Sequence, residues 1–466
     1  MVMSGPSKYG MVSLNRKETA FLVSCGIVSF LVQYYFLLKS GTNIFTSFEH
    51  GRMASELVNF GGFYYYHHLS AHRAPLYVIY LAVLMKYFGL SQNHYMFAFY
   101  LHILITSLFC FPVYALAKHI FSPRVAVISV LVLISDWYVI TLNYLLLPEV
   151  FLTGVILLLL INLYKIEKFQ RKRFAVCCGA LFGIGTLLRG VLLCFFPVAL
   201  LWVSSRGSIP VRKRITYVLL IGMITALTLA PWTIRNYFVF KKLVFGDTTL
   251  GYNLWFGNNE KATGGFAGSD GGKWVPMPKS LVEQTKGMNE AERSEYLIAR
   301  ALDFIKTHPK EFLILRLKSL FYFWFTYNYW HEFKVVFAEV DSFFLKFPRE
   351  GLVLFNLLLV IGLYTAIKDR KDIFLIAGLA AAFSLLYSLF HADAMLRYCA
   401  PLHPALTLFV GNALNKLYGW FSTKRLNSEG ETFSPKEKRG SGLHIDNLNT
   451  SFKTIGAIFI REYNPK

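Results

Sequence analysis

The 466-residue sequence has few charged residues: only 16% are Asp, Glu, Lys or Arg, whereas 55% are hydrophobic. A soluble domain usually carries about 25% charged residues, so this composition excludes an ordinary soluble globular protein. Apolar runs of roughly 16–25 residues recur, which indicates an all-α polytopic membrane protein. The runs cover approximately residues 19–38, 75–88, 94–117, 124–142, 149–166, 174–189, 191–205, 214–232, 312–330, 351–367, 371–391 and 394–418.

The sequence also lacks a signal-peptide cleavage site and a recognisable metal-ligand pattern. No small-residue cleavage site follows the first apolar run, so we expect that run to remain as a membrane anchor. The six cysteines lie in or beside apolar stretches without zinc-ligand spacing, which favours buried thiols. His67, His68 and His72 form a cluster, but its spacing favours solvated or interfacial histidines over a metal site.

Acidic residues are scarce relative to basic ones, and the net charge is +21. The Lys and Arg residues lie in short clusters between apolar runs, which the positive-inside rule explains without a nucleic-acid partner. The clusters at 118–124, 165–173 and 206–214 all fall inside if run 75–88 lies at the interface instead of crossing. The same comparison of charge positions indicates that run 312–330 also stays on the external side without crossing. The sequence thus predicts 10–11 spanning helices in the plasma (inner) membrane, with both termini cytoplasmic.

This topology divides the chain into two parts. A transmembrane module covers residues 1–421, and a polar cytoplasmic tail covers residues 422–466. The module carries a first external loop with interfacial helices, residues 39–93, and a large external segment, residues 233–350. We expect the active groups on this external, periplasmic face, because the unusual charges gather there.

Glu49, Glu149, Arg189, Arg235 and Arg397 are these charges. Each has an ordinary explanation as well: interfacial arginines extend to headgroups, and an acid such as Glu149 favours a helix N-terminus. Together they suggest a reaction. A carboxylate removes a proton from an acceptor hydroxyl or amine, and arginines hold a phosphate and stabilise the charge that builds on it as it leaves.

Six stretches resemble a known family in order and spacing. The chain is similar to bacterial GT-C membrane glycosyltransferases, in the family related to dolichyl-phosphate-mannose protein mannosyltransferases and lipid A aminoarabinose transferases. The stretches are "FEHGRMASELVNFGGFYYYHHLSAHRAPLYVIYLAVLMKYFG", "LLLPEVFLTGVILLLL", "GTLLRGVLLCFFPVALLW", "PWTIRNYFVFKKLVFGDTTLGYNLWFGNNEKATGG", "FIKTHPKEFLILRLKSLFYFW" and "LRYCAPLHPAL".

The resemblance implies a GT-C fold and a catalytic first-loop acid, here Glu49 where the family usually has Asp. It also implies that Glu149 shapes the site and that arginines contact the donor phosphate. In "HRAP", which replaces the more usual "RPP", the candidate is Arg73. The other candidates for this phosphate contact are Arg189, Arg235 and Arg397. His50 and Tyr398 are further candidate site residues. Some relatives use a divalent cation, but the sequence shows no ligand set for one.

The predicted function is transfer of a sugar from a polyprenyl-phosphate-linked donor to a lipid, glycan or protein acceptor. Two alternatives remain open. One is a flippase or transporter of a lipid-linked sugar, although that class usually places ionisable residues near mid-membrane, and Asp136 is the main acid inside an apolar run. The other is a glycan ligase or polymerase that uses a polyprenyl-diphosphate donor. The sequence does not specify the sugar, the acceptor or the oligomeric state.

Overall fold

The computed structural model describes residues 14–39, 48–89, 93–143, 146–264, 277–325, 342–390 and 396–431. These residues are almost entirely helical. The only strands among them, β1 (Tyr64–Tyr65) and β2 (His68–Leu69), form one antiparallel hairpin. The chain divides into two compact units, Met1–Leu417 and Tyr418–Lys466. The predicted boundary at residue 421 stays a prediction.

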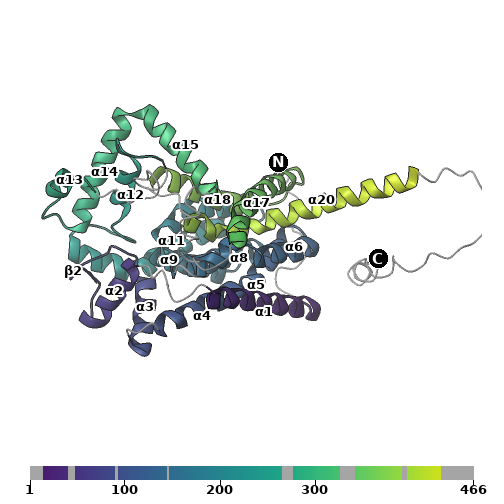
Figure 1. The fold of residues 1–466 in the computed structure, drawn as a ribbon, viewed down its shortest axis with the longest axis horizontal. Helices are drawn as coiled ribbons and strands as arrows, with labels where there is room; N and C mark the ends of the chain where they lie inside the picture. The colour runs from purple at the N-terminus through teal and green to yellow at the C-terminus, as the bar shows by residue number, and fades with distance from the viewer. Residues whose placement is uncertain are drawn as a thin grey trace, which may run out of the picture. The chain divides into compact units, whose positions relative to one another are not determined.

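The first half of the chain contains helices of very different lengths (Figure 1). They are α1 (Arg16–Lys39), α2 (Phe48–Phe60), α3 (Pro75–Phe88), α4 (Asn93–Leu108), α5 (Cys110–Ile120), α6 (Pro123–Ile134), α7 (Trp137–Leu142), α8 (Glu149–Phe169), α9 (Lys172–Leu188), the 3-10 helix η2 (Gly190–Phe195), α10 (Phe196–Ser205) and α11 (Val211–Phe240).

The second half begins with the external segment and returns to apolar helices. Its elements are α12 (Leu250–Gly257), α13 (Lys279–Gln284), α14 (Glu290–Thr307), α15 (Pro309–Phe325), α17 (Ser342–Lys368), α18 (Phe374–Phe390), α19 (Leu396–Cys399), the 3-10 helix η3 (Ala400–Leu402) and α20 (His403–Glu431). Over the described residues, each predicted apolar run forms one helix or a series of two or three consecutive helices.

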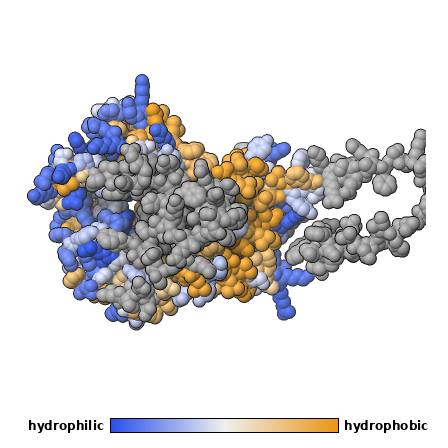
Figure 2. Space-filling model, viewed as in Figure 1, coloured by the Kyte–Doolittle hydropathy of each residue, from blue (hydrophilic) through white to orange (hydrophobic). Residues whose placement is uncertain are grey.

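Five stretches of the described chain are long and apolar enough to cross a membrane: 16–38, 95–120, 149–169, 211–240 and 351–368. Four further apolar helices are shorter, at 75–88, 123–134, 190–205 and 374–389. Figure 2 shows apolar residues gathered on one part of the visible face and hydrophilic residues at the end that holds α13 and α14. The molecule is an integral membrane protein. The predicted number of crossings, the inner-membrane location and the side of each terminus stay predictions.

Close packing of α9 against α11 depends on glycine. A Cβ added at Gly183 would lie 2.4 Å from the Cβ of Thr228, and one at Gly179 would lie 2.8 Å from the carbonyl oxygen of Ile221. Gly179 and Gly183 are four residues apart on one face of α9, the small-xxx-small spacing that lets membrane helices approach closely. The two helices therefore meet at backbone distance and fix the position of Arg189, which directly follows α9.

We expect Gly183→Val to destabilise the protein by about 1–3 kcal/mol, because the added side chain overpacks this interface. The thermal unfolding midpoint in detergent measures the effect. Gly222→Val in α11 is the matched control, since an added Cβ there meets nothing within 4 Å. Equal midpoints for the two variants would contradict the proposed close approach.

The helices that carry the external segment are specified by local sequence. Asn289 and Glu292 form a capping box at the start of α14, in which each side chain accepts a hydrogen bond from the other residue's backbone N–H. In α15, the buried Arg316 donates to the carbonyl oxygens of Gly257 and Ser388. This arginine therefore ties α15 to the end of α12 and to α18 through carbonyl oxygens that accept from its two terminal nitrogens.

Candidate functional site

Glu49 lies in the first turn of α2, where the helix dipole favours an acidic residue. The helix forms because His50, Met53, Ala54 and Leu57 recur at helical spacing and pack inward on one face. The Glu49 side chain remains 34% exposed at the edge of this face. The predicted catalytic acid is thus on a short packed helix and accessible to a substrate.

Both carboxylate oxygens of Glu49 have a partner from the chain segment that precedes α3. Oε1 lies 3.1 Å from Nε2 of His72, and Oε2 accepts hydrogen bonds from Nε of Arg73, at 2.9 Å, and from its Nη2. The structure therefore brings Glu49 and Arg73 together, as two of the predicted site residues. His72 joins them, although the sequence analysis considered it only in a histidine cluster.

The β1–β2 hairpin positions His72. Its turn residues Tyr66 and His67 have φ values of 52° and 64°, the left-handed conformation that two-residue hairpin turns require. Contacts from α2 hold this turn: the backbone N–H of His67 donates to Glu56 at 3.1 Å, and the Arg52 guanidinium lies 3.7 Å from the centre of the Tyr66 ring. The hairpin then presents the ring of Tyr65.

The ring of Tyr65 stacks flat against the imidazole of His72, with centroids 4.7 Å apart and an interplanar angle of 4°. The backbone N–H of His72 donates to Oγ of Ser70 at 2.9 Å. The position of the imidazole is therefore fixed by its stacking partner, by its own backbone and by its contact with Glu49.

Charge at Glu49 is strongly stabilised. Burial alone would raise the pKa of the Glu49 carboxyl, but the hydrogen bond from His72 and the charge of Arg73 outweigh burial and lower its pKa well below the usual range. Burial, followed by the nearby Glu49 charge, raises the pKa of the Tyr65 phenol. At neutral pH, Glu49 is an ionised carboxylate beside a neutral phenol.

Glu290, the first residue of α14, anchors the loop that carries His72 and Arg73. Its carboxylate accepts hydrogen bonds from Oγ of Ser70 (2.7 Å), the N–H of Ala71 (2.9 Å) and Oγ1 of Thr248 (3.0 Å). The N–H of Thr248 also donates to the carbonyl oxygen of Ala71. The sequence analysis missed this residue, because its partners in the first loop lie about 220 positions away.

Arg235 supports the same loop from α11. Its guanidinium donates to the carbonyl oxygens of Ser70, at 2.8 Å, and Phe63, at 3.1 Å. It also lies 5.0 Å from the centre of the Trp232 ring. The structure thus places this predicted donor-binding arginine against the loop backbone, where it positions the hairpin. A contact between Arg235 and a donor stays a prediction.

If the loop around His72 and Arg73 serves the sugar transfer predicted from the sequence, Glu290→Ala lowers the rate of that reaction by about tenfold to a hundredfold, because small misplacements of active groups have effects of this size. The variant removes three hydrogen bonds to a carboxylate and leaves the N–H of Ala71 without its partner. Glu295→Ala is the control: Glu295 lies on the same helix and forms an ion pair with the exposed Lys242, a class of contact worth about 0–1 kcal/mol. Initial rates of the two variants, compared at equal protein level, test this; equal losses would mean that the anchor is not needed.

Glu149 and Arg189 form a second ion pair. Glu149 is the first residue of α8, and its carboxylate is 1% exposed. Oε1 accepts a hydrogen bond from Nη1 of Arg189, whereas Oε2 is buried without a hydrogen-bond partner among the described residues. The Arg189 guanidinium also lies 4.9 Å from the centre of the Tyr398 ring. Three predicted site residues from distant parts of the chain therefore meet here.

Tyr77 of α3 lies near residues that belong to, or adjoin, each ion pair. Its ring meets the ring of His50, the neighbour of Glu49, edge-on at 5.4 Å, and its phenol interacts electrostatically with the Glu149 carboxylate. Next to Arg189, Tyr387 stacks on Tyr398 with centroids 4.5 Å apart. The predicted candidate His50 thus contributes a buried ring to the packing that connects the pairs.

Arg397 belongs to α19, but its side chain lies outside the described residues. The predicted phosphate contact of Arg397 is therefore untested. No group of three or more His, Cys, Asp or Glu side chains among the described residues could hold a metal ion. One oxygen of Glu149 is bound by Arg189, and the divalent cation that the resemblance allows stays untested.

Asp136, the acid inside an apolar run, also has a partner. Its Oδ2 lies 2.9 Å from Nδ1 of His403, which is 1% exposed. The imidazole is stacked between the rings of Tyr138 and Phe355, at 4.6 and 4.5 Å. Asp136 therefore belongs to a packed pair that joins the start of α7 to α20.

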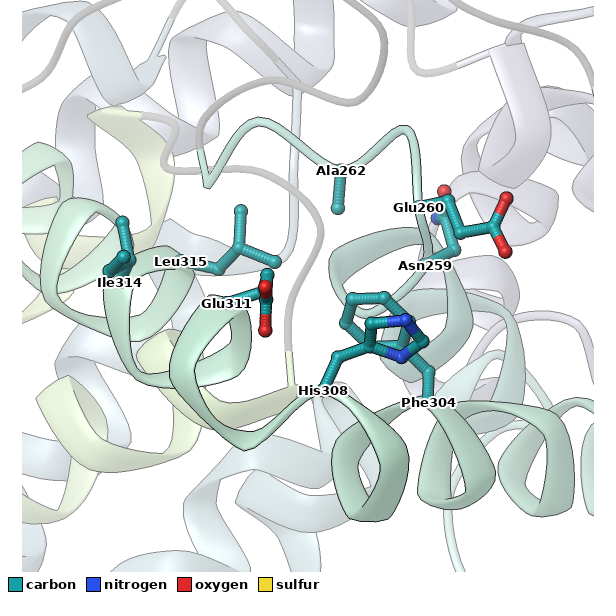
Figure 3. Close-up of a pocket in the computed structure, with 8 residues that line it drawn as sticks. All are labelled: Asn259, Glu260, Ala262, Phe304, His308, Glu311, Ile314 and Leu315. Carbon is teal, nitrogen blue, oxygen red and sulfur yellow. The ribbon is translucent and has the colours of Figure 1, made fainter.

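A pocket of about 330 Å³ lies elsewhere in the external segment (Figure 3). Its walls come from the chain after α12, the end of α14 and the start of α15. They are formed by Asn259, Glu260, Ala262, Phe304, His308, Glu311, Ile314 and Leu315. None of the predicted site residues lines this pocket, so we assign it no role in the reaction.

Comparisons with known proteins agree with the sequence motifs. Residues 72–234 match the family of dolichyl-phosphate-mannose-protein mannosyltransferases. No curated protein matches the sequence.

Among solved structures, archaeal oligosaccharyltransferase AglB from Archaeoglobus fulgidus, in complex with an inhibitory peptide and a dolichol-phosphate, is similar with a TM-score of 0.51 and 12% identity. That match covers 96% of this chain and 55% of the other. The oligosaccharyltransferase of the same organism in the apo form matches with a TM-score of 0.51 and 13% identity, over 91% and 52% of the two chains.

ArnT from Cupriavidus metallidurans, bound to undecaprenyl phosphate, matches with 14% identity and a TM-score of 0.48, over 90% of this chain and 64% of the other. The chain spans less than two thirds of the length of these three proteins. The resemblance predicted from the motifs is confirmed: the chain is an integral membrane protein with the GT-C fold, and over residues 72–234 it is similar to the dolichyl-phosphate-mannose-protein mannosyltransferases.

Proposed function

We propose that the protein is a glycosyltransferase that moves a sugar from a polyprenyl-phosphate carrier to an acceptor at the external face of the membrane. The main observation behind the proposal is that the two predicted acids, Glu49 and Glu149, each bind an arginine. Tyr77 packs on His50, next to the first acid, and lies near the second. The matching family is named for a polyprenyl-phosphate sugar, and one structure with the same fold contains a dolichol-phosphate. Both support a donor of this class.

The chemistry follows from these groups. Glu49, with its neighbours, provides the general base for the acceptor, as expected for the first-loop carboxylate. Arg189 and Arg73 are the guanidinium groups nearest the two acids, and they would hold the donor phosphate bidentately as charge develops on it. A phosphate leaves without much help from a general acid, so a base and cationic groups are sufficient for an inverting transfer.

The side of the membrane on which the reaction takes place is inferred from the distribution of charged residues. The clusters of Lys and Arg at 118–124, 165–173 and 206–214 favour a cytoplasmic position for those turns. This arrangement supports an active site on the external or periplasmic side and cytoplasmic termini. The acceptor is then a lipid, glycan or protein that is exposed on that side.

A donor panel tests the function. Purified full-length protein in nanodiscs is incubated with undecaprenyl-phosphate-linked sugars and a membrane extract as the acceptor source, and mass spectrometry follows the products. We expect free undecaprenyl phosphate together with a glycosylated acceptor. Diphosphate release from a diphosphate-linked donor would instead support a ligase or polymerase. Movement of an intact sugar–lipid between leaflets, without cleavage, would support a flippase and contradict the proposal.

A further inference from the structure

Both carboxylate oxygens of Glu49 are already bound by cationic or hydrogen-bonding partners. Oε2 binds two nitrogens of Arg73, and Oε1 binds Nε2 of His72. A carboxylate held in this way is stable as an anion and is therefore a weak proton acceptor at neutral pH. General bases work best when their proton affinity suits the operating pH, and histidine fills this role most often.

His72 has the geometry of such a base. Because Nε2 faces an acceptor oxygen, the neutral ring carries its proton there and has a lone pair on Nδ1. No described residue is bonded to Nδ1, and 27% of the side chain is exposed. Stacking on Tyr65 fixes the ring plane. The free nitrogen is therefore oriented and reachable.

We propose that His72 is the proton-accepting residue of the transfer reaction and that Glu49 acts through it, an inference that rests on the proposed function. As the acceptor oxygen bonds to the anomeric carbon of the sugar, its O–H bond breaks and the proton moves to Nδ1 of His72. The bond from the anomeric carbon to the phosphate oxygen breaks with its electron pair on the phosphate. Glu49 stabilises the imidazolium, which later releases its proton to solvent.

The charged and titratable groups around His72 suit this role. Glu49 of α2 meets one edge of the ring, Arg73 follows His72 in the chain and binds the same carboxylate, and the neutral phenol of Tyr65 covers one face. When His72 accepts a proton, the cluster of Glu49, Arg73 and His72 changes from neutral to a single positive charge. That charge appears beside the donor phosphate as the phosphate becomes more negative.

The His72→Gln variant shows whether His72 acts as a base or only positions Glu49. The amide nitrogen of Gln replaces Nε2 and can still donate to Glu49, but Gln has no nitrogen that accepts a proton. We expect kcat to fall by about a hundredfold or more, with donor KM nearly unchanged. Activity of His72→Gly should rise on addition of imidazole, which a purely structural role would not produce.

The controls distinguish this inference from the proposed function. Rates are measured with full-length protein in nanodiscs and the undecaprenyl-phosphate sugar that the donor panel identifies. Wild-type activity in His72→Gln, together with an inactive Glu49→Gln, would overturn the role of His72 and leave the function intact. Full activity in Glu49→Gln, or no transfer by the wild type with any donor, would instead contradict the proposed function itself.

Discussion

Replacing Glu49 with Gln is expected to lower the transfer rate by about 10²–10⁴-fold, the range that loss of general acid–base catalysis produces. The amide has nearly the same shape as the carboxylate, so α2 keeps its packing. It cannot hold the positive charge of Arg73 or stabilise a protonated His72. The measurement is release of undecaprenyl phosphate by protein that reaches the membrane at wild-type level.

Glu56→Gln is the matched control for this experiment, because Glu56 lies on the same helix and undergoes the same change. Its carboxylate accepts hydrogen bonds from the backbone N–H of His67 and from Nε of Arg52, and the single oxygen of Gln can keep the bond from His67. We expect this variant to retain its rate within about tenfold, as befits a residue that acts on the hairpin turn. Equal loss of activity in both variants would show that α2 tolerates no change, and a specific catalytic role of Glu49 would then have no support.

The second large effect is expected when either partner of the Glu149–Arg189 ion pair is replaced, because both stability and donor use depend on it. Removing one partner of a buried ion pair leaves the other charge unpaired and costs about 3–5 kcal/mol. We therefore expect Arg189→Ala and Glu149→Ala each to lower the thermal unfolding midpoint strongly. The double variant should be more stable than either single variant, because no uncompensated charge remains, and all three should lose donor use.

Lys416 and Asp369 provide the comparison, since they pair at 2.6 Å with both side chains more than a third exposed. Alanine at either position should change stability by at most about 1 kcal/mol. Donor KM and the unfolding midpoint are measured for all variants. An Arg189→Ala protein with wild-type stability and unchanged donor KM would refute both the buried pair and the phosphate contact.

Local patterns predicted most helices because each depends on neighbouring residues. Apolar runs of sufficient length predicted the helices that can cross a membrane. Gly61, with φ of 68°, allows the turn after α2, as expected for a glycine at this position. The run at 124–142 breaks into α6 and α7, which the pattern did not predict. The break lies at Asp136, whose side chain accepts a hydrogen bond from the N–H of Tyr138 and lies against His403.

The site was harder to predict, because pairing depends on tertiary structure. The resemblance identified Glu49, Glu149 and Arg189 by position, but it did not show that Arg73 binds Glu49. That contact requires a hairpin whose left-handed turn is formed by Tyr66 and His67, residue types that such turns rarely use. A sequence rule based on Asn or Gly finds no hairpin here.

The anchor formed by Glu290 has a consequence for protein engineering. It joins residues 70 and 71 to Thr248 and to the beginning of α14, so the first loop and the external segment are structurally interdependent. A chimera that exchanges the external segment alone separates Glu290 from its own partners, Ser70 and Ala71, in the first loop. Exchanging specificity between relatives therefore requires that both regions be transplanted together from the same parent.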